Sequence, residues 1–237
     1  MDPIRMHWDV RSTEYNDFVV KGYNNLRERR AWQDHFSSIL GTEPLNILDV
    51  GCGSGLISLI MAQRCSNALV TAIDIDEGAV SQTRINADHS PWAARITTLK
   101  VRMQDHTPAA PYDHIVCNPP FFSHSLKCPD EQRTAARHAD SLSLNDLLFH
   151  ARRMLTPEGL ISVIIPADLK GDADTASSLA GMYCIRQTWI KTTPLKQPKR
   201  VLMAFSPSYR PCNQDNTPET IIVGDDHYHI ITDDLYL

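Results

Sequence analysis

Asn118, Pro119, Pro120 and Phe121 follow one another directly after a short apolar run, residues 112–117. The carboxamide oxygen of Asn118 and the backbone carbonyl of Pro119 can each accept one hydrogen from an exocyclic amine, and Phe121 offers an aromatic face for the attached ring. The two prolines fix φ and stiffen the segment before a substrate arrives. This combination suits methylation of a planar NH2 group, and its alternative is a proline-rich turn after a strand.

A second segment with chemical character lies upstream, where another apolar run leads directly into Gly51, Gly53 and Gly55. Glycines tolerate positive φ and let the backbone approach a ligand closely. Asp49 stands just before this turn, and Asp74 ends the next apolar run, where it is placed to hold two ribose hydroxyls. The third glycine comes one position too early for the dinucleotide fingerprint, so the spacing favours S-adenosylmethionine over NAD. The alternative for the glycines alone is an ordinary tight turn.

Strand-like and helix-like segments alternate through the first half of the chain, which predicts a parallel α/β sheet. The expected elements are strands over residues 45–50, 68–75, 96–101 and 112–117, and helices that begin at Leu56 and Glu77. Open sheets of this kind bind ligands at the edge where the carboxyl ends of the strands meet. That edge is expected to carry the glycine turn and four polar side chains, Asp74, Gln104, Asp105 and Asn118. One crevice would then hold both reactants.

The second half of the chain is expected to complete the sheet. A long loop over residues 119–143 precedes a helix over 144–155, and loops of that length are commonly functional. A turn from Thr156 to Gly159 then leads into a strand over 160–165. The remaining expected elements are a helix over 175–182, strands over 185–192 and 200–205, and a flexible connection over 209–219.

Four stretches have a distinctive sequence: residues 90–96, 118–122, 133–138 and 198–207. With the glycine turn, they resemble the class I S-adenosylmethionine-dependent methyltransferases from about Leu45 onward. More narrowly, they resemble the bacterial tRNA(Val) adenine-N6 methyltransferases, which modify the adenine 3′ of the anticodon. The resemblance implies a Rossmann-like, doubly wound, mostly parallel seven-stranded sheet with a C-terminal antiparallel hairpin. It also implies S-adenosylmethionine as the cofactor and methyl transfer to the N6 of an unpaired adenine in the tRNA anticodon stem-loop.

The same resemblance and the positions on the sheet assign roles to single residues. The expected catalytic residues are Asn118, Pro119 and Phe121. The expected cofactor-binding residues are Asp49, Gly51, Gly53, Gly55, Asp74, Ile75, Gln104, Asp105 and Asn118. The expected substrate-binding residues are Pro120, Phe122, His124, Arg133, Arg137, His138, Lys199 and Arg200. For Asp105, expected to accept from the adenine amino group of the cofactor, the alternative is a loop cap. For Arg133 and Arg137 the alternative is that the two side chains, four positions apart, merely share one face of a helix.

The first forty or so residues depart from the family pattern. Family members open with a strand rich in Phe and Lys and a Lys-Val-Gly-Thr-Asp-Gly segment, and neither stands in this sequence. Residues 8–18 instead resemble the cap helix of small-molecule methyltransferases in the same superfamily. A rough apolar stripe with helical spacing follows and ends before Gly41. The sequence therefore predicts an N-terminal helical cap over residues 1–41 and a methyltransferase domain over residues 42–237.

Length and composition fit one enzyme domain, because 237 residues that are 42% hydrophobic can bury a single sizeable core. The six cysteines form no CxxC pair and no metal-ligand spacing with the histidines. The sequence shows no signal peptide and no apolar run long enough to span a bilayer. We therefore expect a cytoplasmic, monomeric enzyme without a metal or a membrane partner.

A net charge of −5 argues against indiscriminate nucleic-acid binding, so any RNA contact must come from local basic clusters. Two clusters are candidates. They consist of Arg27, Arg29 and Arg30 on an expected helix, and of Lys191, Lys196, Lys199 and Arg200 in a late loop. The alternative for both is a solvated surface.

Several other functions remain open. The same carboxamide geometry serves guanine-N2 methylation of rRNA and glutamine-N5 methylation of proteins, although enzymes of the second kind carry an extra helical domain. The atypical N-terminus keeps a small-molecule substrate open. A non-enzymatic alternative is a cofactor-binding RNA module without turnover, which the presence of Asn118 and Asp74 argues against.

Overall fold

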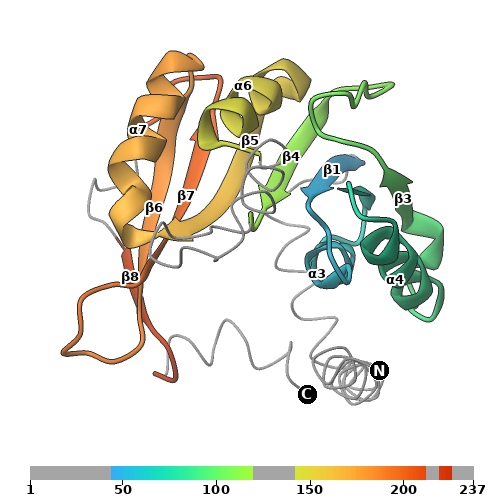
Figure 1. The fold of residues 1–237 in the computed structure, drawn as a ribbon, viewed down its shortest axis with the longest axis horizontal. Coiled ribbons are helices and arrows are strands. Elements are labelled where there is room, and N and C mark those ends of the chain that lie inside the picture. The colour runs from blue at the N-terminus through green and yellow to red at the C-terminus, as the bar shows by residue number, and fades with distance from the viewer. Residues whose placement is uncertain (1–43, 120–141, 212–218, 226–237) are drawn as a thin grey trace, which may run out of the picture.

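The structure is a computed structural model that describes residues 44–119, 142–211 and 219–225 (Figure 1). Several predictions fall outside these residues. They are the helical cap over residues 1–41, the cluster Arg27, Arg29 and Arg30, and the site residues Pro120, Phe121, Phe122, His124, Arg133, Arg137 and His138. The domain boundary at residue 42 also stays a prediction.

Within the described residues, eight strands form one mixed sheet in the order β3-β2-β1-β4-β5-β7-β6-β8. The strands are β1 (Leu45–Val50), β2 (Ala68–Asp74), β3 (Ile96–Lys100), β4 (Tyr112–Cys117), β5 (Leu155–Pro166), β6 (Tyr183–Lys191), β7 (Arg200–Ser206) and β8 (Glu219–Ile222). The first five run parallel to one another in the order β3-β2-β1-β4-β5. The predicted Rossmann-like α/β fold is confirmed.

The parallel strands end level with one another, and this register builds the crevice. Val50, the last residue of β1, pairs with Ile73 of β2 on one side and with Cys117 of β4 on the other. Gly51 and Asn118, which follow β1 and β4, and Asp74, the last residue of β2, therefore lie at one edge of the sheet. Neighbouring strands lie about 4.8 Å apart, so the three positions are within reach of a single ligand.

The C-terminal part of the sheet differs from the prediction by one strand. β7 is antiparallel to both β5 and β6, which forms the expected hairpin and leaves β6 parallel to β5. β8 then adds an eighth strand parallel to β6, where seven strands were expected. The Glu219 carboxylate at the start of β8 accepts from Arg186 at 2.9 Å and from Thr188 at 2.8 Å, both on β6. These long-range contacts anchor a four-residue strand that is too short to show a pattern of its own.

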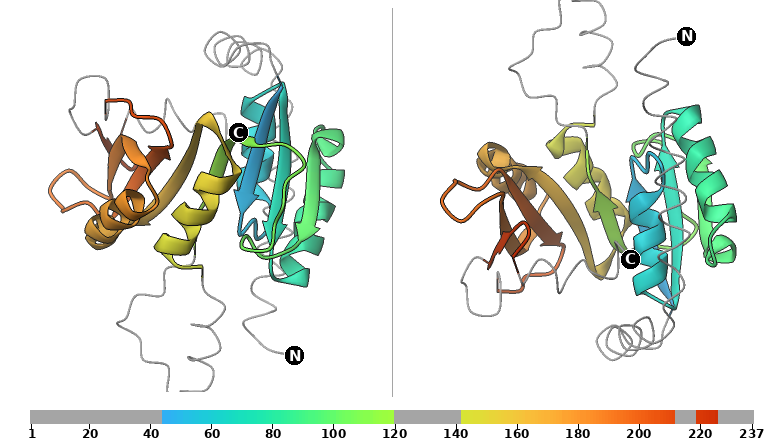
Figure 2. Two further views of the ribbon diagram at one scale, coloured as in Figure 1. Left: turned by 90° about the horizontal axis from the view of Figure 1, so that it is seen from above. Right: turned by 90° about the horizontal axis from the view of Figure 1, so that it is seen from below.

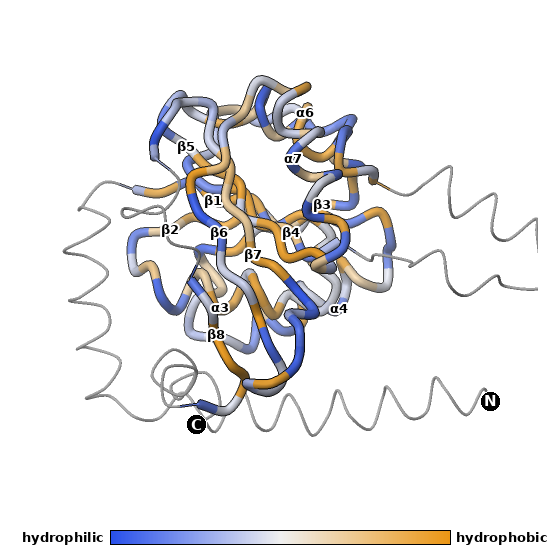
Figure 3. The backbone as a smooth tube through the Cα atoms, turned by 90° about the vertical axis from the view of Figure 1, so that its left-hand side faces the viewer, coloured by the Kyte–Doolittle hydropathy of each residue, from blue (hydrophilic) through white to orange (hydrophobic). Residues whose placement is uncertain are grey.

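Helices cover both faces of the sheet, as a doubly wound fold requires. They are α3 (Leu56–Arg64), α4 (Glu77–Asp88), α6 (Leu144–Met154) and α7 (Lys170–Leu179), with single 3-10 turns η1 (Ala93–Arg95) and η2 (Ala167–Leu169). Figure 2 shows α6 and α7 beside the β5 to β6 part of the sheet and α4 beside β3. One apolar core includes residues of α6 and α7, and a second includes residues of α3. Figure 3 shows the apolar stretches that strands such as β4 and β7 contribute to the interior.

The predicted turn from Thr156 to Gly159 is wrong, because these residues lie inside β5. The pairing of β4 with β5 shifts in register between Tyr112 and His114. The chain of β5 therefore continues in the same direction through an irregular pairing and does not turn back. A Cβ on Gly159 would come within 3.0 Å of the Tyr112 carbonyl oxygen. The glycine therefore permits a close approach of two strands.

The helix expected over residues 175–182 begins five residues earlier, at Lys170, and ends at Leu179. Its first turn carries an ion pair between Lys170 and Asp174 at 2.5 Å, a spacing of four residues that stabilises a helix. Gly181 follows the helix with φ of 66° and stops it.

Candidate active site

The turn after β1 takes its shape from three glycines in the left-handed region. Gly51, Gly53 and Gly55 have φ of 71°, 56° and 81°. A Cβ at Gly51 or Gly53 would meet nothing within 4 Å, so the backbone dihedral alone calls for glycine there. A Cβ at Gly55 would also lie 2.7 Å from Cγ2 of Thr83. The turn is thus strained for any other residue, and its third position is also crowded.

Two side chains of α4 donate hydrogen bonds to backbone carbonyls of the glycine turn. Thr83 Oγ1 donates to the Gly53 carbonyl at 2.9 Å, and Asn86 Nδ2 donates to the Ser54 carbonyl at 2.8 Å. The two residues are three positions apart on one face of the helix. Sequence reasoning missed both, and this spacing on a helix that follows a glycine turn is the signal that would have found them.

Asp74 lies against the turn, as the sequence predicted from its place at the end of β2. Its carboxylate accepts from the Gly53 amide at 3.1 Å and from the Asp76 amide at 3.0 Å. A carboxylate has about four acceptor positions, so capacity remains for two hydroxyl donors. The next residue, Ile75, is 53% exposed at the same edge, and Asp76 caps α4 by accepting from the Ala79 amide at 2.9 Å.

Asp49 is buried beneath the turn with half of its hydrogen-bonding capacity in use. Oδ2 accepts from the Ser58 hydroxyl at 2.6 Å, while Oδ1 is buried without a hydrogen-bond partner. Burial raises the pKa of Asp49 to about 6, against the lowering effect of hydrogen bonds from the Ser58 side chain and backbone. An unpartnered buried oxygen of this kind is costly unless a cation or donor meets it. The site is therefore able to take a positively charged group.

Asn118 and Pro119 leave β4 next to the turn that leaves β1. Asn118 is exposed, and Pro119 is buried. The preceding residue, Cys117, pairs with Val50, so the carboxamide lies one strand away from Gly51. The structure thus brings the predicted amine-binding residue to the predicted cofactor turn. The rest of that motif, from Pro120 onward, lies outside the described residues.

Gln104 and Asp105 lie in a tight turn soon after β3, at the same edge of the sheet. Gln104 is half-buried and Asp105 is exposed. The Asp105 amide donates to the Arg102 carbonyl at 3.0 Å, and the Val101 amide donates to the Asp74 carbonyl at 3.0 Å. These bonds tie the loop to the end of β2, so Asp105 is placed at the edge that carries Asp74.

Lys199 ends the connection between β6 and β7, and Arg200 is the first residue of β7. Because β6 runs parallel to β5, this connection also lies at the carboxyl edge of the sheet, and Figure 1 shows it projecting from the body of the protein. Lys196, Lys199 and Arg200 are exposed. Within the described part of the chain, no carboxylate forms an ion pair with any of these three. The connection therefore presents positive charge beside the crevice.

The thiols near the crevice are held in their neutral form. Burial raises the pKa of Cys52 to about 11 and that of Cys117 still further. The nearby histidine of β4, His114, has its pKa lowered to about 4 by burial, and its Nε2 lies 2.9 Å from the Ser162 hydroxyl. These groups favour packing roles.

The described residues contain no cluster of three or more His, Cys, Asp or Glu side chains arranged to hold a metal ion. No helix among residues 44–119, 142–211 and 219–225 is long and apolar enough to span a bilayer.

Comparisons with known proteins extend over most of the chain. A family model described as "Methyltransferase small domain" matches residues 35–188. A tRNA1(Val) (adenine(37)-N6)-methyltransferase from Phocaeicola vulgatus is 45% identical over 212 residues, which cover 87% of this chain and 86% of the relative. A protein of the same name from Bacteroides fragilis is 37% identical over 205 residues, which cover 80% of this chain and 86% of the relative.

Solved structures share the fold at low identity. A predicted O-methyltransferase from Agrobacterium tumefaciens matches with a TM-score of 0.58 at 19% identity and covers 81% of this chain and 88% of its own. Magnesium protoporphyrin IX methyltransferase from Synechocystis, solved with bound S-adenosylmethionine, matches with a TM-score of 0.51 at 15% identity, over 81% of this chain and 83% of its own. The chain therefore belongs to the methyltransferase small domain family of class I S-adenosylmethionine-dependent methyltransferases and is closely related to the tRNA1(Val) adenine-N6 enzymes.

Proposed function

We propose that the protein transfers a methyl group from S-adenosylmethionine to the N6 of adenine 37 in tRNA1(Val). The observation that carries this proposal is the 45% identity to an enzyme of that name over 86% of the relative's length. Identity at that level over both chains extends well beyond the cofactor turn. The placement of Asn118 one strand away from the glycine turn gives the activity a physical basis.

The residues at the carboxyl edge fit the cofactor. S-adenosylmethionine supplies a methyl group on a positively charged sulfur, which a nitrogen lone pair can attack. The unpartnered oxygen of Asp49 suits the ammonium of its amino-acid part, and Asp74 suits the ribose hydroxyls. Ile75 would contact the nucleoside as an exposed apolar side chain, while Gln104 and Asp105 would accept from its adenine amine. The open backbone at Gly51 and Gly53 leaves room for the ligand.

Asn118 and Pro119 would act on the amine to be methylated. An adenine amine is a poor nucleophile because its lone pair is shared with the ring. When Asn118 Oδ1 and the Pro119 carbonyl accept its two hydrogens, electron density on the nitrogen rises as the new bond forms. Orientation of the two reactants can contribute about 7–11 kcal/mol to lowering the barrier. Phe121 would add about 1–3 kcal/mol of base stacking.

The transfer needs neither a covalent intermediate nor a strong base. The nitrogen forms one bond to the methyl carbon as the bond from carbon to sulfur breaks, and the extra proton on the amine then leaves to solvent. Cys52 and Cys117 stay protonated because burial raises their pKa values, so neither offers a thiolate nucleophile. The chemistry therefore rests on positioning by Asn118 and Pro119.

Local positive charge supports an RNA substrate despite the net charge of −5. Lys196, Lys199 and Arg200 would contact phosphates of an anticodon stem-loop whose adenine enters beside Asn118. The residues of the long loop, Phe122, His124, Arg133, Arg137 and His138, remain proposals for guiding the RNA. An adenine in a loop is already only partly stacked, which lowers the cost of bringing it to the site.

The test is to incubate the protein with labelled S-adenosylmethionine and with unmodified tRNA, rRNA and total protein in parallel. We expect N6-methyladenosine at position 37 of tRNA1(Val), located by mass mapping of RNA fragments. Label in rRNA guanine or in protein glutamine would replace the proposal with guanine-N2 or glutamine-N5 methylation. Cofactor binding without transfer to any acceptor would indicate an RNA-binding module without turnover.

A further inference from the structure

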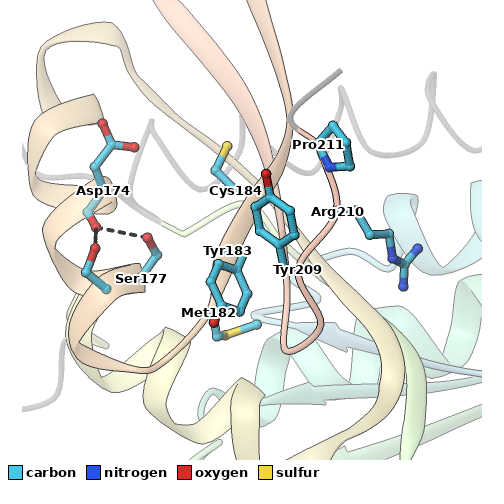
Figure 4. Close-up of a pocket in the computed structure, with 9 residues that line it drawn as sticks. Asp174, Ser177, Met182, Tyr183, Cys184, Tyr209, Arg210 and Pro211 are labelled. Carbon is cyan, nitrogen blue, oxygen red and sulfur yellow. Dashed lines mark hydrogen bonds between the residues drawn. The ribbon is translucent and has the colours of Figure 1, made fainter. Parts of the chain in front are cut away.

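A pocket of about 530 Å³ lies at the edge of the sheet opposite the active site. Its walls are the C-terminal half of α7, the start of β6 and the segment that follows β7, as Figure 4 shows. β6 runs parallel to β5, so its first residue, Tyr183, lies at the amino edge of the parallel strands. None of the residues expected to bind the cofactor or the target amine lines this pocket.

Two exposed tyrosines form the centre of the pocket. The ring centroids of Tyr183 and Tyr209 are 5.5 Å apart at 84° between planes, an edge-to-face arrangement. Tyr183 is 46% exposed and Tyr209 is 74% exposed. Paired aromatic rings of this kind attract one another, yet most of the surface of Tyr209 and nearly half of that of Tyr183 stay in contact with water. Exposed aromatic surface beside a pocket is characteristic of a binding site.

The backbone on both sides of Tyr209 is fixed. The hydroxyl of Ser208 donates to the Pro157 carbonyl at 2.6 Å, and the guanidinium of Arg210 donates to the Glu158 carbonyl at 2.6 Å. The Ser208 amide also donates to the Ser206 hydroxyl at 3.2 Å. Figure 4 shows the Arg210 guanidinium directed away from the two rings. The backbone that carries Tyr209 is thus held in place before any ligand arrives, which lowers the entropy cost of binding.

The charges around the pocket are paired, and its remaining polar groups include several acceptors. Asp174 pairs with Lys170 at 2.5 Å, and Arg210 pairs with Glu158 at 3.4 Å. The hydroxyls of Ser177 and Ser178 both donate to the Asp174 carbonyl and keep their acceptor lone pairs. A cluster for bare phosphate would need unpaired cations. This lining instead suits a flat, uncharged ring with N–H donors at its rim, which describes a nucleobase.

We propose that the Tyr183 and Tyr209 pair binds an unpaired base of the substrate RNA as a second contact, remote from methyl transfer. The inference rests on the proposed tRNA substrate. Three strand spacings of about 4.8 Å and an offset of about four residues along the strands place the pair about 20 Å from Asn118. A base bound there therefore belongs to a nucleotide that lies several nucleotides away from the target adenine in the RNA. The contact strengthens RNA binding and leaves the chemistry at the amine unchanged.

The test compares the affinity of wild-type protein and variants for unmodified tRNA1(Val), measured by fluorescence anisotropy. Loss of base stacking in Tyr209→Ala is expected to raise Kd by about 5- to 150-fold, and Tyr209→Phe, which keeps the ring, should stay within about twofold of wild type. Leu69→Ala on β2 is the matched surface control, since Leu69 is 49% exposed and lies elsewhere. Saturating kcat and the Kd for S-adenosylhomocysteine should not change in any of these variants.

A second measurement uses the wild-type protein and does not depend on variant folding. Photocrosslinking with 5-iodouridine-substituted tRNA should attach RNA to Tyr183 or Tyr209. The inference would be overturned if Tyr209→Ala and wild type bound tRNA with equal affinity, or if neither tyrosine were crosslinked. The proposed function would still stand in that case, provided that the wild-type protein methylates tRNA normally. A loss of self-association in Tyr209→Ala at unchanged tRNA affinity would identify an interface between copies instead. If wild-type protein methylates no tRNA, both proposals fail together.

Discussion

Asp49 offers a quantitative test of the cofactor site, because its environment changes the protonation of one carboxylate. Burial raises its pKa from 3.8 to about 6. A raised pKa means that the folded protein favours the neutral acid. The stability contributed by the protonated group is fully present below pH 3.8 and is lost as pH rises through 6. At pH 8 the ionised carboxylate destabilises the ligand-free protein by about 3 kcal/mol, from about two pKa units at 1.36 kcal/mol each.

The same carboxylate is the proposed partner of the cofactor ammonium, so binding should need its ionised form. With a pKa of about 6, roughly 90% of Asp49 is ionised at pH 7 and roughly 10% at pH 5. The Kd of wild-type protein for S-adenosylhomocysteine, measured by calorimetry, should therefore rise about tenfold between pH 7 and pH 5.

Asp49→Asn should bind S-adenosylhomocysteine more weakly at pH 7 and show a flat profile over this range. It should also be more stable than wild type at pH 8, by up to about 3 kcal/mol in urea unfolding, and the difference should shrink toward pH 4. Asp113→Asn is the control, because this carboxylate lies away from the crevice. It accepts a hydrogen bond from the Asn46 amide, with a distance of 2.9 Å between the nitrogen and the oxygen. A wild-type Kd that changes less than about twofold between pH 5 and pH 7 would refute the reasoning.

Three further changes test the parts around the crevice. Asp74→Ala removes the acceptor of the Gly53 and Asp76 amides and should raise the Kd for S-adenosylhomocysteine by about 10- to 100-fold, and unchanged affinity would remove Asp74 from the ribose site. Gly55→Ala places a Cβ 2.7 Å from Cγ2 of Thr83 and should lower the free energy of unfolding by about 1–3 kcal/mol. Adding Thr83→Ser should recover part of that loss, whereas Gly181→Ala, with open space at its Cβ, should lose only about 1 kcal/mol. The double variant Lys199→Ala and Arg200→Ala should weaken tRNA binding and lower the slope of log K against log salt by about 1.4 to 1.8. Lys100→Ala, which changes a lysine paired with Glu77, is the control, and an unchanged salt slope in the double variant would exclude phosphate contacts there.

The elements around the crevice could be predicted from the sequence because their signals are local. β1 and β4 have the predicted bounds, since each is a short apolar run that stops just before a change in sequence, at Gly51 for β1 and at Asn118 and Pro119 for β4. Their parallel arrangement followed from the alternation of strands and helices. The adjacency of Asp74, the glycine turn and Asn118 then follows from the register of three strands.

Features that depend on distant contacts could not be predicted in the same way. β8 is held by Arg186 and Thr188, more than thirty positions before Glu219. Gly159 looks like a turn residue in sequence, and only its closeness to the Tyr112 carbonyl shows why a strand needs it. The support of the glycine turn by Thr83 and Asn86 also joins segments about thirty residues apart. Hydropathy patterns carry no information on such pairings.

The most direct test of one shared active site is single-turnover methylation of unmodified tRNA1(Val) by wild-type protein and Asn118→Ala. Methyl transfer to N6 of adenine 37 is followed by mass spectrometry, and cofactor affinity is measured beside it. We expect Asn118→Ala to lose about 100-fold or more of the transfer rate, because one of two oriented acceptors is gone, while the affinity for S-adenosylhomocysteine falls far less than the transfer rate. A variant that methylates adenine 37 at the wild-type rate would contradict the role of Asn118 and the active site built around it.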